Sequence, residues 1–513
     1  MRPSQRITAL AIAIAVPMAM AIEATAQGKE TPAQKLLSER GSLAFVDVDV
    51  YVGDGSKLEK VTVLVEDGKI QKVGKDLAVP RSAKRIEGGV LTPGFVMLGS
   101  TAGVRGGAPV PRNDQVIIVQ GRRGRGRPMP TGPSSSAAPF TPNVKVSDRL
   151  DPKSKELADW LEAGVTTHGV RPPTSGLSGL GAAIRPVGDE ASDLVLQDET
   201  FAWLGMTANT KTKKSIREGF EKAKELIEQR KKAKAEAKKP ATPPAAKAGA
   251  AKPEEAKKEG AKPGEGEKPK PDPKPQPNPT PDPKPTPKPT PQPKPNEPPQ
   301  GKPAANKSQG KDDAKKPAAP KEDPRHAVLA QSLEGERKVL LGVSGPGELL
   351  HALQALDGFE LPLVVMHTFR RGEDATLDLV SEQLAKTKAT VVCTVDLGSK
   401  PATAILTNPI ARLQKAGLTM ALVPGTRPSE AQEVWYRLGE LMRTGLEPGK
   451  LIEAMTLTPA KVLGVDKQVG SIEKDKDANF LHFSHDPFGP TARLEHVYFE
   501  GREVKNVKTK HGS

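Results

Sequence analysis

Alternating prolines interrupt this chain and place the strongest limit on how it can fold. Residues 233–321 contain 24 of the 51 prolines, and from Lys268 to Pro299 nearly every second residue is proline. Because proline lacks a backbone N–H and has a fixed φ, this spacing excludes helix and interior strand and favours extended polyproline II. The stretch is otherwise rich in Lys and Ala, so it cannot bury a core. We predict that residues 233–321 form a disordered insertion between two parts of one folded region.

The same insertion carries most of the positive charge. The chain has a net charge of +15, and residues 231–320 hold 21 Lys against 11 acidic residues. The basic balance is therefore a property of one segment and not of the folded parts. A second basic stretch, Gly121–Arg127, separates its arginines by glycines and lacks interleaved aromatic residues for base stacking. We therefore predict no nucleic-acid partner.

The N-terminus has the pattern of a secretory signal. Arg2 and Arg6 precede an apolar run from Ile7 to Ile22, and Ala24-Thr-Ala supplies small residues for cleavage. The apolar run is shorter than the roughly 20 residues that span a bilayer. We predict a cleavable signal peptide over residues 1–26, a periplasmic or secreted mature protein and no transmembrane span; an uncleaved anchor is the alternative. The single cysteine, Cys393, lies in an apolar run and is predicted to be a buried structural thiol.

Short amphipathic strands occur at both ends of the chain. Residues 43–52 alternate apolar and polar side chains, and Asp67-Gly68 and Glu500-Gly501 are typical of hairpin tips. Because both ends contain short amphipathic strands with hairpin turns, we predict a composite β-sandwich built from residues 38–92 and 465–513.

The middle of the chain alternates strands and helices. Apolar runs at 339–343, 361–366, 390–395 and 418–423 alternate with helical patterns at 348–356, 375–386 and 429–444. Such alternation is typical of a parallel α/β layout. We predict a TIM-like (β/α)8 barrel over residues 93–464, interrupted by the insertion.

Several ordered motifs resemble the amidohydrolase superfamily, in particular its imidazolonepropionase-like group. The motifs that show this resemblance are Val65-Glu-Asp-Gly-Lys-Ile, Leu91-Thr-Pro-Gly-Phe-Val, Ala163-Gly-Val-Thr-Thr, Ala454-Met-Thr-Leu-Thr-Pro-Ala-Lys-Val-Leu-Gly-Val, Val469-Gly-Ser-Ile and Asp486-Pro-Phe-Gly-Pro. The likeness covers residues 42–230 and 324–506, and within it Gly176–Gly181 matches a family loop. It implies the barrel, and metal-dependent hydrolysis of C–N bonds in small amides or cyclic ureas, with zinc or another divalent metal at the barrel mouth.

The positions that hold the family's metal carry other residues in this chain. Gly99 and Thr101 occupy the places of the first histidine pair, and Met97 replaces the acidic residue beside them. Gly342 and Ser344 stand where the resemblance implies two further histidines, and Gly425 stands near the last carboxylate. Glycine offers no ligand atom and hydroxyls are poor zinc ligands, so we predict no metal cofactor.

Two histidines remain as weak catalytic candidates. His367 matches a metal-bearing histidine of the family, and His168 follows the Gly-Val-Thr-Thr strand and is read more simply as a hydrogen-bonded strand-end residue. His482, His485 and His496 fall in the terminal strands and receive no catalytic assignment.

Three functions follow from these observations. The first is an exported, catalytically degenerate amidohydrolase-like protein that binds an unidentified small molecule. The alternatives are an active hydrolase with a metal-free site at His367 and His168, and an envelope structural or interaction protein that uses the Lys-Pro segment. Cell-envelope contact through that segment and homo-oligomerisation stay open.

Overall fold

The computed structural model describes residues 30–105, 139–207, 209–237 and 322–505. The predicted signal peptide, the basic stretch Gly121–Arg127 and the predicted insertion beyond residue 237 lie outside these ranges. Helix α3 (Thr210–Ala237) runs into the first residues that were assigned to the insertion. Apart from the last residue of α3, all the elements described below belong to one compact unit.

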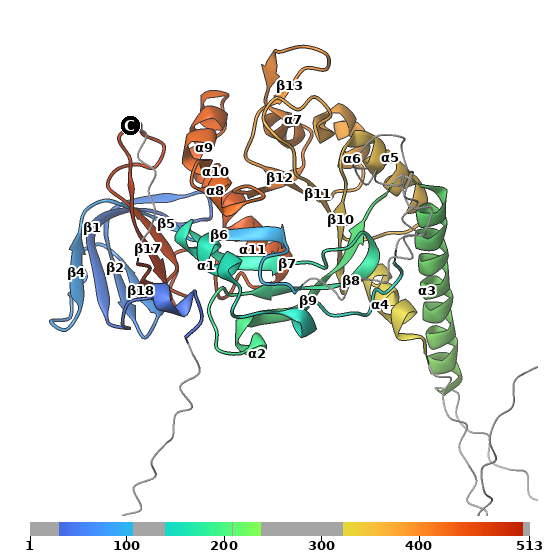
Figure 1. Ribbon diagram of the computed structural model, residues 1–513, viewed down its shortest axis with the longest axis horizontal. Helices are drawn as coiled ribbons and strands as arrows, with labels where there is room; N and C mark the ends of the chain where they lie inside the picture. The colour runs from blue at the N-terminus through green and yellow to red at the C-terminus, as the bar shows by residue number, and fades with distance from the viewer. Residues whose placement is uncertain (1–29, 106–138, 208, 238–321, 506–513) are drawn as a thin grey trace, which may run out of the picture. The chain divides into compact units, whose positions relative to one another are not determined.

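Strands from the two ends of the chain form one hydrogen-bonded sheet, here called the terminal β domain (Figure 1). The order is β18-β17-β16-β5-β1-β2-β3, with β4 paired to β1. Its strands are β1 (Leu43–Tyr51), β2 (Lys57–Glu66), β3 (Lys69–Gly74), β4 (Lys84–Glu87), β5 (Val90–Pro93), β16 (Phe480–Phe483), β17 (Leu494–Phe499) and β18 (Arg502–Glu503). Antiparallel pairing of β5 with β16 joins strands from the two ends in a single sheet, so both ends contribute to one β domain.

The core of the terminal β domain mixes side chains from both ends. Phe45 packs edge-on against Phe480 at 5.6 Å and against Tyr498 at 5.1 Å between ring centroids. The predicted hairpin tips are also present, because Asp67-Gly68 and Glu500-Gly501 all have positive φ, as tight two-residue hairpins require.

The second large sheet is a nearly closed barrel with the order β15-β12-β11-β10-β9-β8-β7-β6. Its strands are β6 (Phe95–Ser100), β7 (Val165–Val170), β8 (Gly176–Ile184), β9 (Val195–Gly205), β10 (Lys338–Gly342), β11 (Leu363–His367), β12 (Thr390–Thr394) and β15 (Thr419–Val423). A TIM-like fold is therefore present, although β6 and β15 share no recorded ladder within the described ranges.

Helices connect and cover the barrel strands (Figure 1). They are α1 (Lys155–Glu162), α2 (Ala191–Leu194), α3, α4 (Pro324–Leu333), α5 (Pro346–Ala355), α6 (Ser381–Ala385), α7 (Pro409–Lys415), α8 (Pro428–Ala431), α9 (Val434–Arg443), α10 (Pro448–Met455) and α11 (Leu457–Leu463). Short 3-10 turns occur at Gln34–Leu36, Ser147–Arg149 and Leu377–Val380. Two strands of two residues each, β13 (Gly398–Ser399) and β14 (Leu406–Thr407), pair antiparallel. Cys393 lies fully buried on β12, as predicted.

One barrel strand departs from the predicted repeat. β8 is antiparallel to both β7 and β9, because residues 171–175 are too few for the crossover that parallel neighbours need. The prediction of a loop at Gly176–Gly181 is wrong, since these residues belong to β8. Their glycines serve close packing: a Cβ on Gly181 would lie 2.2 Å from the Phe201 ring, and one on Gly179 2.3 Å from the Val144 carbonyl oxygen.

Candidate functional site

The positions aligned with the family's metal ligands meet at the mouth of the barrel. Parallel strands end at the same face of a barrel, and β6, β10, β11 and β15 carry or immediately precede these positions. Two cavities open there. One of about 530 Å³, the Trp203 cavity, includes Gly342 and Ser344 in its lining; a smaller one of about 110 Å³, the Thr101 cavity, includes Gly99, Thr101 and Gly425.

Three residues line both cavities and so lie between them. They are Arg171, which follows β7, Met366 on β11 and Thr368 just after it. The five replaced positions therefore surround a shared centre formed by these three side chains.

Neighbouring side chains fill the space into which metal ligands would extend. Gly99 has φ +70°, and a Cβ there would lie 2.2 Å from Met366 Sδ. A Cβ on Gly342 would lie 2.2 Å from Cη2 of the Trp203 indole, and one on Gly425 2.5 Å from Glu430 Cβ. These distances are far below van der Waals contact, so an imidazole or a carboxylate would fit at these positions only after its neighbours moved.

The donor atoms at the mouth do not fit a catalytic metal. Such a site needs about three protein ligands with one coordination position open. Among the described residues, three His, Cys, Asp or Glu donors converge at one place, and it lies in the terminal β domain. The mouth offers Glu156 in the smaller cavity and Glu348 and Glu373 in the larger one.

Arg171 places a fixed positive charge at this centre. Its Nε donates to the Gly99 carbonyl at 3.0 Å and its Nη1 to the Pro172 carbonyl at 2.9 Å. The guanidinium lies 4.3 Å from the centroid of the Trp203 ring, a cation–π contact, and Trp203 Nε1 is held by the Thr174 carbonyl at 2.8 Å. Burial lowers the pKa of Arg171 from its usual value, and no carboxylate within the described ranges pairs with it. The only sequence signal for this residue is its place directly after β7.

The glutamates of the Trp203 cavity are bound to backbone amides. Glu348 accepts from the Ser344 N–H at 2.8 Å, and Glu373 accepts from the Arg370 N–H at 3.0 Å. The cavity thus combines one cation stacked on an aromatic ring with two carboxylates at other parts of its wall.

His367 does not face either cavity. Its side chain lies on β11, is 1% exposed, and stacks on Phe369 with the ring centroids 5.6 Å apart. Neither ring nitrogen has a hydrogen-bond partner among the described residues. Burial lowers the pKa of His367, opposed in part by Glu373, the Ser344 backbone and Asp378. The ring lines neither cavity, although its chain neighbours Met366 and Thr368 line both.

His168 is buried completely and makes no hydrogen bond to the part of the chain that the structure describes. It lies on β7 next to Met97 of β6, and its ring meets the Trp160 indole edge-on at 6.3 Å. Burial lowers its pKa to about 3. The interpretation of His168 as a hydrogen-bonded histidine is therefore wrong. Because no polar group within the described ranges forms a hydrogen bond with the imidazole, it has no neighbour there with which to exchange a proton.

Sequence reasoning missed one further charged group near the mouth. Asp396 follows β12 and is 5% exposed, and its Oδ2 accepts from Arg437 Nη1 at 3.0 Å while Oδ1 has no partner. Burial raises the pKa of Asp396 to about 6, although Arg437 and Arg371 oppose the shift. Its position after a barrel strand is the signal that could have drawn attention to it.

Comparisons with known proteins place this geometry in context. A family model described as the amidohydrolase family matches residues 425–509. The crystal structure of an amidohydrolase from Thermotoga maritima MSB8 is similar at 19% identity and a TM-score of 0.57, covering 90% of this chain and 99% of that one. A beta-aspartyl dipeptidase from Fervidobacterium islandicum AW-1, in complex with a beta-Asp-Leu dipeptide, matches at 12% identity and a TM-score of 0.40, covering 93% and 99%. No curated protein matches the sequence.

No helix within residues 30–105, 139–207, 209–237 and 322–505 could span a membrane. Each helix in these ranges is too short or too polar to cross a bilayer.

Proposed function

We propose that this chain, a member of the amidohydrolase superfamily, binds a small zwitterionic ligand such as an amino acid or a short peptide at its barrel mouth and does not hydrolyse it with a metal. One observation carries the proposal. At the point where the five replaced ligand positions meet, Arg171 presents a largely buried guanidinium without a carboxylate partner in the described ranges.

The state of Arg171 favours an anionic ligand group. Its Nε and Nη1 are fixed by carbonyls, and Nη2 makes no hydrogen bond within the described part of the chain. An unpaired buried charge is costly, and a ligand carboxylate would offset that cost with a charge-assisted hydrogen bond. The Trp203 ring holds the guanidinium in place, so little side-chain freedom is lost on binding.

The carboxylates of the Trp203 cavity favour a second, cationic ligand group. Glu348 and Glu373 line the same cavity as Arg171, and each is oriented by a backbone N–H. A ligand amine directed at these carboxylates and a ligand carboxylate directed at Arg171 would match both signs of charge. The volume of about 530 Å³ suits an amino acid or dipeptide.

Loss of metal-dependent hydrolysis is part of the proposal. Gly99, Gly342 and Gly425 supply no ligand atoms, and Met366, Trp203 and Glu430 occupy the adjoining space. The alternative of a metal-free hydrolase at His367 has less support, because that ring lies outside both cavities. An envelope role of the Lys-Pro segment concerns residues outside the described ranges and stays a prediction.

A binding screen with matched ligands tests the proposal. Calorimetry with dipeptides should detect binding that weakens at least about tenfold when the ligand's C-terminus is amidated or its N-terminus acetylated. Arg171→Gln should abolish the preference for a free carboxylate, and Arg171→Lys should keep part of it. Arg149→Gln, at an exposed arginine, is the control. Hydrolysis of the same dipeptides that stops on chelation would contradict the proposal.

Export is proposed on the N-terminal sequence alone. Arg2, Arg6, the apolar run and Ala24-Thr-Ala favour removal of residues 1–26 during secretion. N-terminal sequencing of protein made in a secreting host should give a mature end near Gln27, and an intact Met1 in fractionated cells would refute cleavage.

A further inference from the structure

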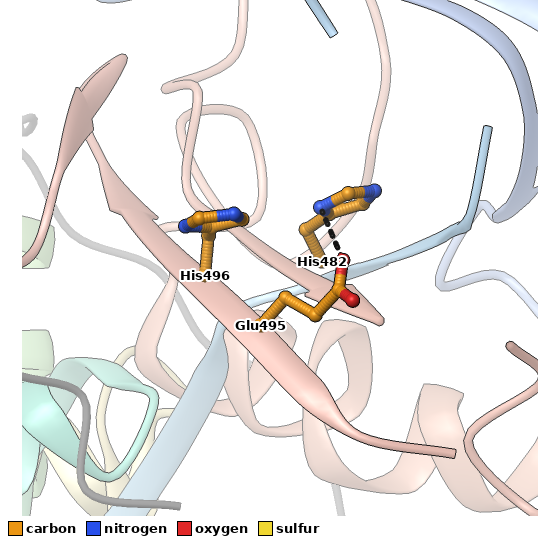
Figure 2. Close-up of side chains that lie close together, drawn as sticks. All are labelled: His482, Glu495 and His496. Atoms are coloured by element: carbon orange, nitrogen blue, oxygen red, sulfur yellow. Dashed lines mark ion pairs between the residues drawn. The ribbon is translucent and has the colours of Figure 1, made fainter. Parts of the chain in front are cut away.

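A cluster of metal-ligating groups lies in the terminal β domain, apart from the barrel mouth. His482 on β16 stands directly opposite His496 on β17, and Glu495 is the residue before His496 (Figure 2). One ligand atom from each of the three residues lies within 4.8 Å of the other two. Opposed residues of antiparallel strands face the same side of a sheet, which explains why the two imidazoles meet.

A break in the strand register brings Glu495 to the same side. Successive residues of a regular strand face opposite sides, so Glu495 and His496 would normally diverge. Here His482 pairs with His496 while the next residue, Phe483, pairs with Leu494, which leaves Glu495 as an extra residue in β17. Such a bulge redirects a side chain, and bulges of this kind are common beside functional sites.

A backbone carbonyl determines which ring nitrogen of His482 carries the proton. Its Nε2 lies 3.0 Å from the Gly88 carbonyl oxygen, which can only accept, so Nε2 carries the proton. Nδ1 therefore has a free lone pair. This nitrogen is buried, makes no hydrogen bond with any other described residue, and lies 3.9 Å from Glu495 Oε2. Two electron-rich atoms thus face each other with no donor between them, an arrangement that a cation stabilises. A backbone carbonyl behind the imidazole is also how proteins orient metal-binding histidines.

His496 is oriented in a similar way. Its Nδ1 lies 2.9 Å from Glu503 Oε1 on β18, and a carboxylate accepts, so this nitrogen donates and Nε2 keeps a lone pair. The ring is stacked on that of His482 with an interplanar angle of 11° and centroids 5.8 Å apart.

We propose that His482, Glu495 and His496 bind one divalent transition-metal ion, with zinc as the preferred ion. Two imidazoles and a carboxylate form a ligand set that zinc accepts, with a fourth position for water. Tetrahedral zinc with bonds of about 2.1 Å places its ligands about 3.4 Å apart, so the cluster must contract slightly. Glu495 and His496 are 44% and 40% exposed, so their side chains have room to move toward the buried His482. The open side also gives the ion a path from solvent.

The bound ion would join two neighbouring strands of the C-terminal segment and act on the N-terminal one only through the backbone contact of His482. β16 and β17 come from the C-terminal segment, and the Gly88 carbonyl that orients His482 belongs to the N-terminal one. Because the unfolded chain lacks this preformed cluster, zinc should stabilise the folded state by mass action.

Zinc titration of the untagged full-length protein tests the site. Competition against a chromophoric chelator should give one zinc ion per chain, and His496→Gln should weaken binding at least about 100-fold, beyond the 10- to 100-fold expected for loss of a mere orienting partner. His496 is half exposed, so this variant should fold; the His482→Gln variant should show the same loss. His485→Gln, at an exposed histidine of the same domain, is the matched control.

A second measurement separates this site from the barrel mouth. Zinc should raise the melting temperature of the wild-type and His485→Gln proteins but not that of His496→Gln. If no zinc binds, or if binding is unchanged in both His496→Gln and His482→Gln, the proposal is wrong. Zinc binding that persists in those variants and disappears on mutation of Glu348 and Glu373 would move the ion to the mouth and contradict the proposed function as well.

Discussion

Two buried histidines lie on strands of the barrel and two histidines lie opposite each other in the terminal β domain, and the two pairs differ in what surrounds them. His168 and His367 lie on barrel strands, yet within the described ranges none of their ring nitrogens has a hydrogen-bond partner. His482 and His496 each have one nitrogen fixed by an oxygen acceptor, and with Glu495 they form a cluster. Position on a strand of an enzyme-like barrel is therefore not sufficient for chemistry. Convergence of donor atoms, created here by strand register and a bulge, is what makes a site.

The largest effect that would sharpen this comparison is the loss of folding stability in acid that the buried His168 should cause. Its pKa is near 6.5 in the unfolded chain and about 3 in the folded one, so below pH 6.5 the unfolded state binds a proton that the folded state excludes. This contribution to stability is complete above pH 6.5 and is lost as the pH falls toward 3. At pH 4 it should cost about 3 kcal/mol relative to pH 7.

Denaturant unfolding of a His168→Leu variant at the two pH values measures this contribution. The variant should lose about 3 kcal/mol less than the wild type between pH 7 and pH 4, because leucine fills the site without an ionisable group. His351→Gln, at an exposed histidine on α5, should behave like the wild type. Equal pH dependence in the wild type and His168→Leu would show that the ring has access to a proton in the folded state.

The second predicted effect is on stability and concerns side-chain packing at the barrel mouth. Gly342→Ala should lower the free energy of unfolding by about 2 kcal/mol, because its Cβ would lie 2.2 Å from the Trp203 ring and overpack the site. Gly439→Ala on α9 is the control: a Cβ there meets nothing within 4 Å, and alanine in a helix should stabilise by about 0.5–1 kcal/mol. If Gly342→Ala unfolds like the wild type, the Trp203 side chain is free to move and the mouth could open for larger groups.

The parts of the fold that were predicted correctly follow local rules. The strand at Thr390–Thr394 and the helix at Pro346–Ala355 follow apolar runs and helical spacing, and the tips at Asp67-Gly68 and Glu500-Gly501 follow turn chemistry. The shared terminal sheet was predicted from the matching style of the two ends. The inverted β8 could not be predicted, because its glycines read as a loop and only contacts with Phe201 and Val144 show that they belong to a tightly packed strand.

The site was less accessible to sequence reasoning than the fold. The resemblance to the family's motifs identified five positions, and these line the two cavities at the barrel mouth: Gly99, Thr101, Gly342, Ser344 and Gly425. It did not reveal Arg171, because its partners Trp203 and the Gly99 carbonyl are distant in sequence. The cluster of His482, Glu495 and His496 was missed for a related reason: regular alternation places Glu495 on the wrong side, and the bulge that corrects this is visible only in the pairing of β16 with β17.

The smallest expected effect tests whether orientation, and not only ligand identity, matters in the terminal β domain. Glu503 holds His496 Nδ1 at 2.9 Å and also forms an ion pair with Lys84 at 3.2 Å. If Glu503 fixes the protonation of the imidazole, Glu503→Gln should weaken zinc binding about tenfold, since loss of such partners typically costs 10- to 100-fold. Lys84→Gln removes the ion pair but leaves the contact with His496, so its zinc affinity should match that of the wild type. Equal losses in the two variants would assign the effect to surface charge, whose influence also fades at high salt. A loss confined to Glu503→Gln at high and low salt would show that the carboxylate acts through the imidazole, which is the kind of support that His168 and His367 lack.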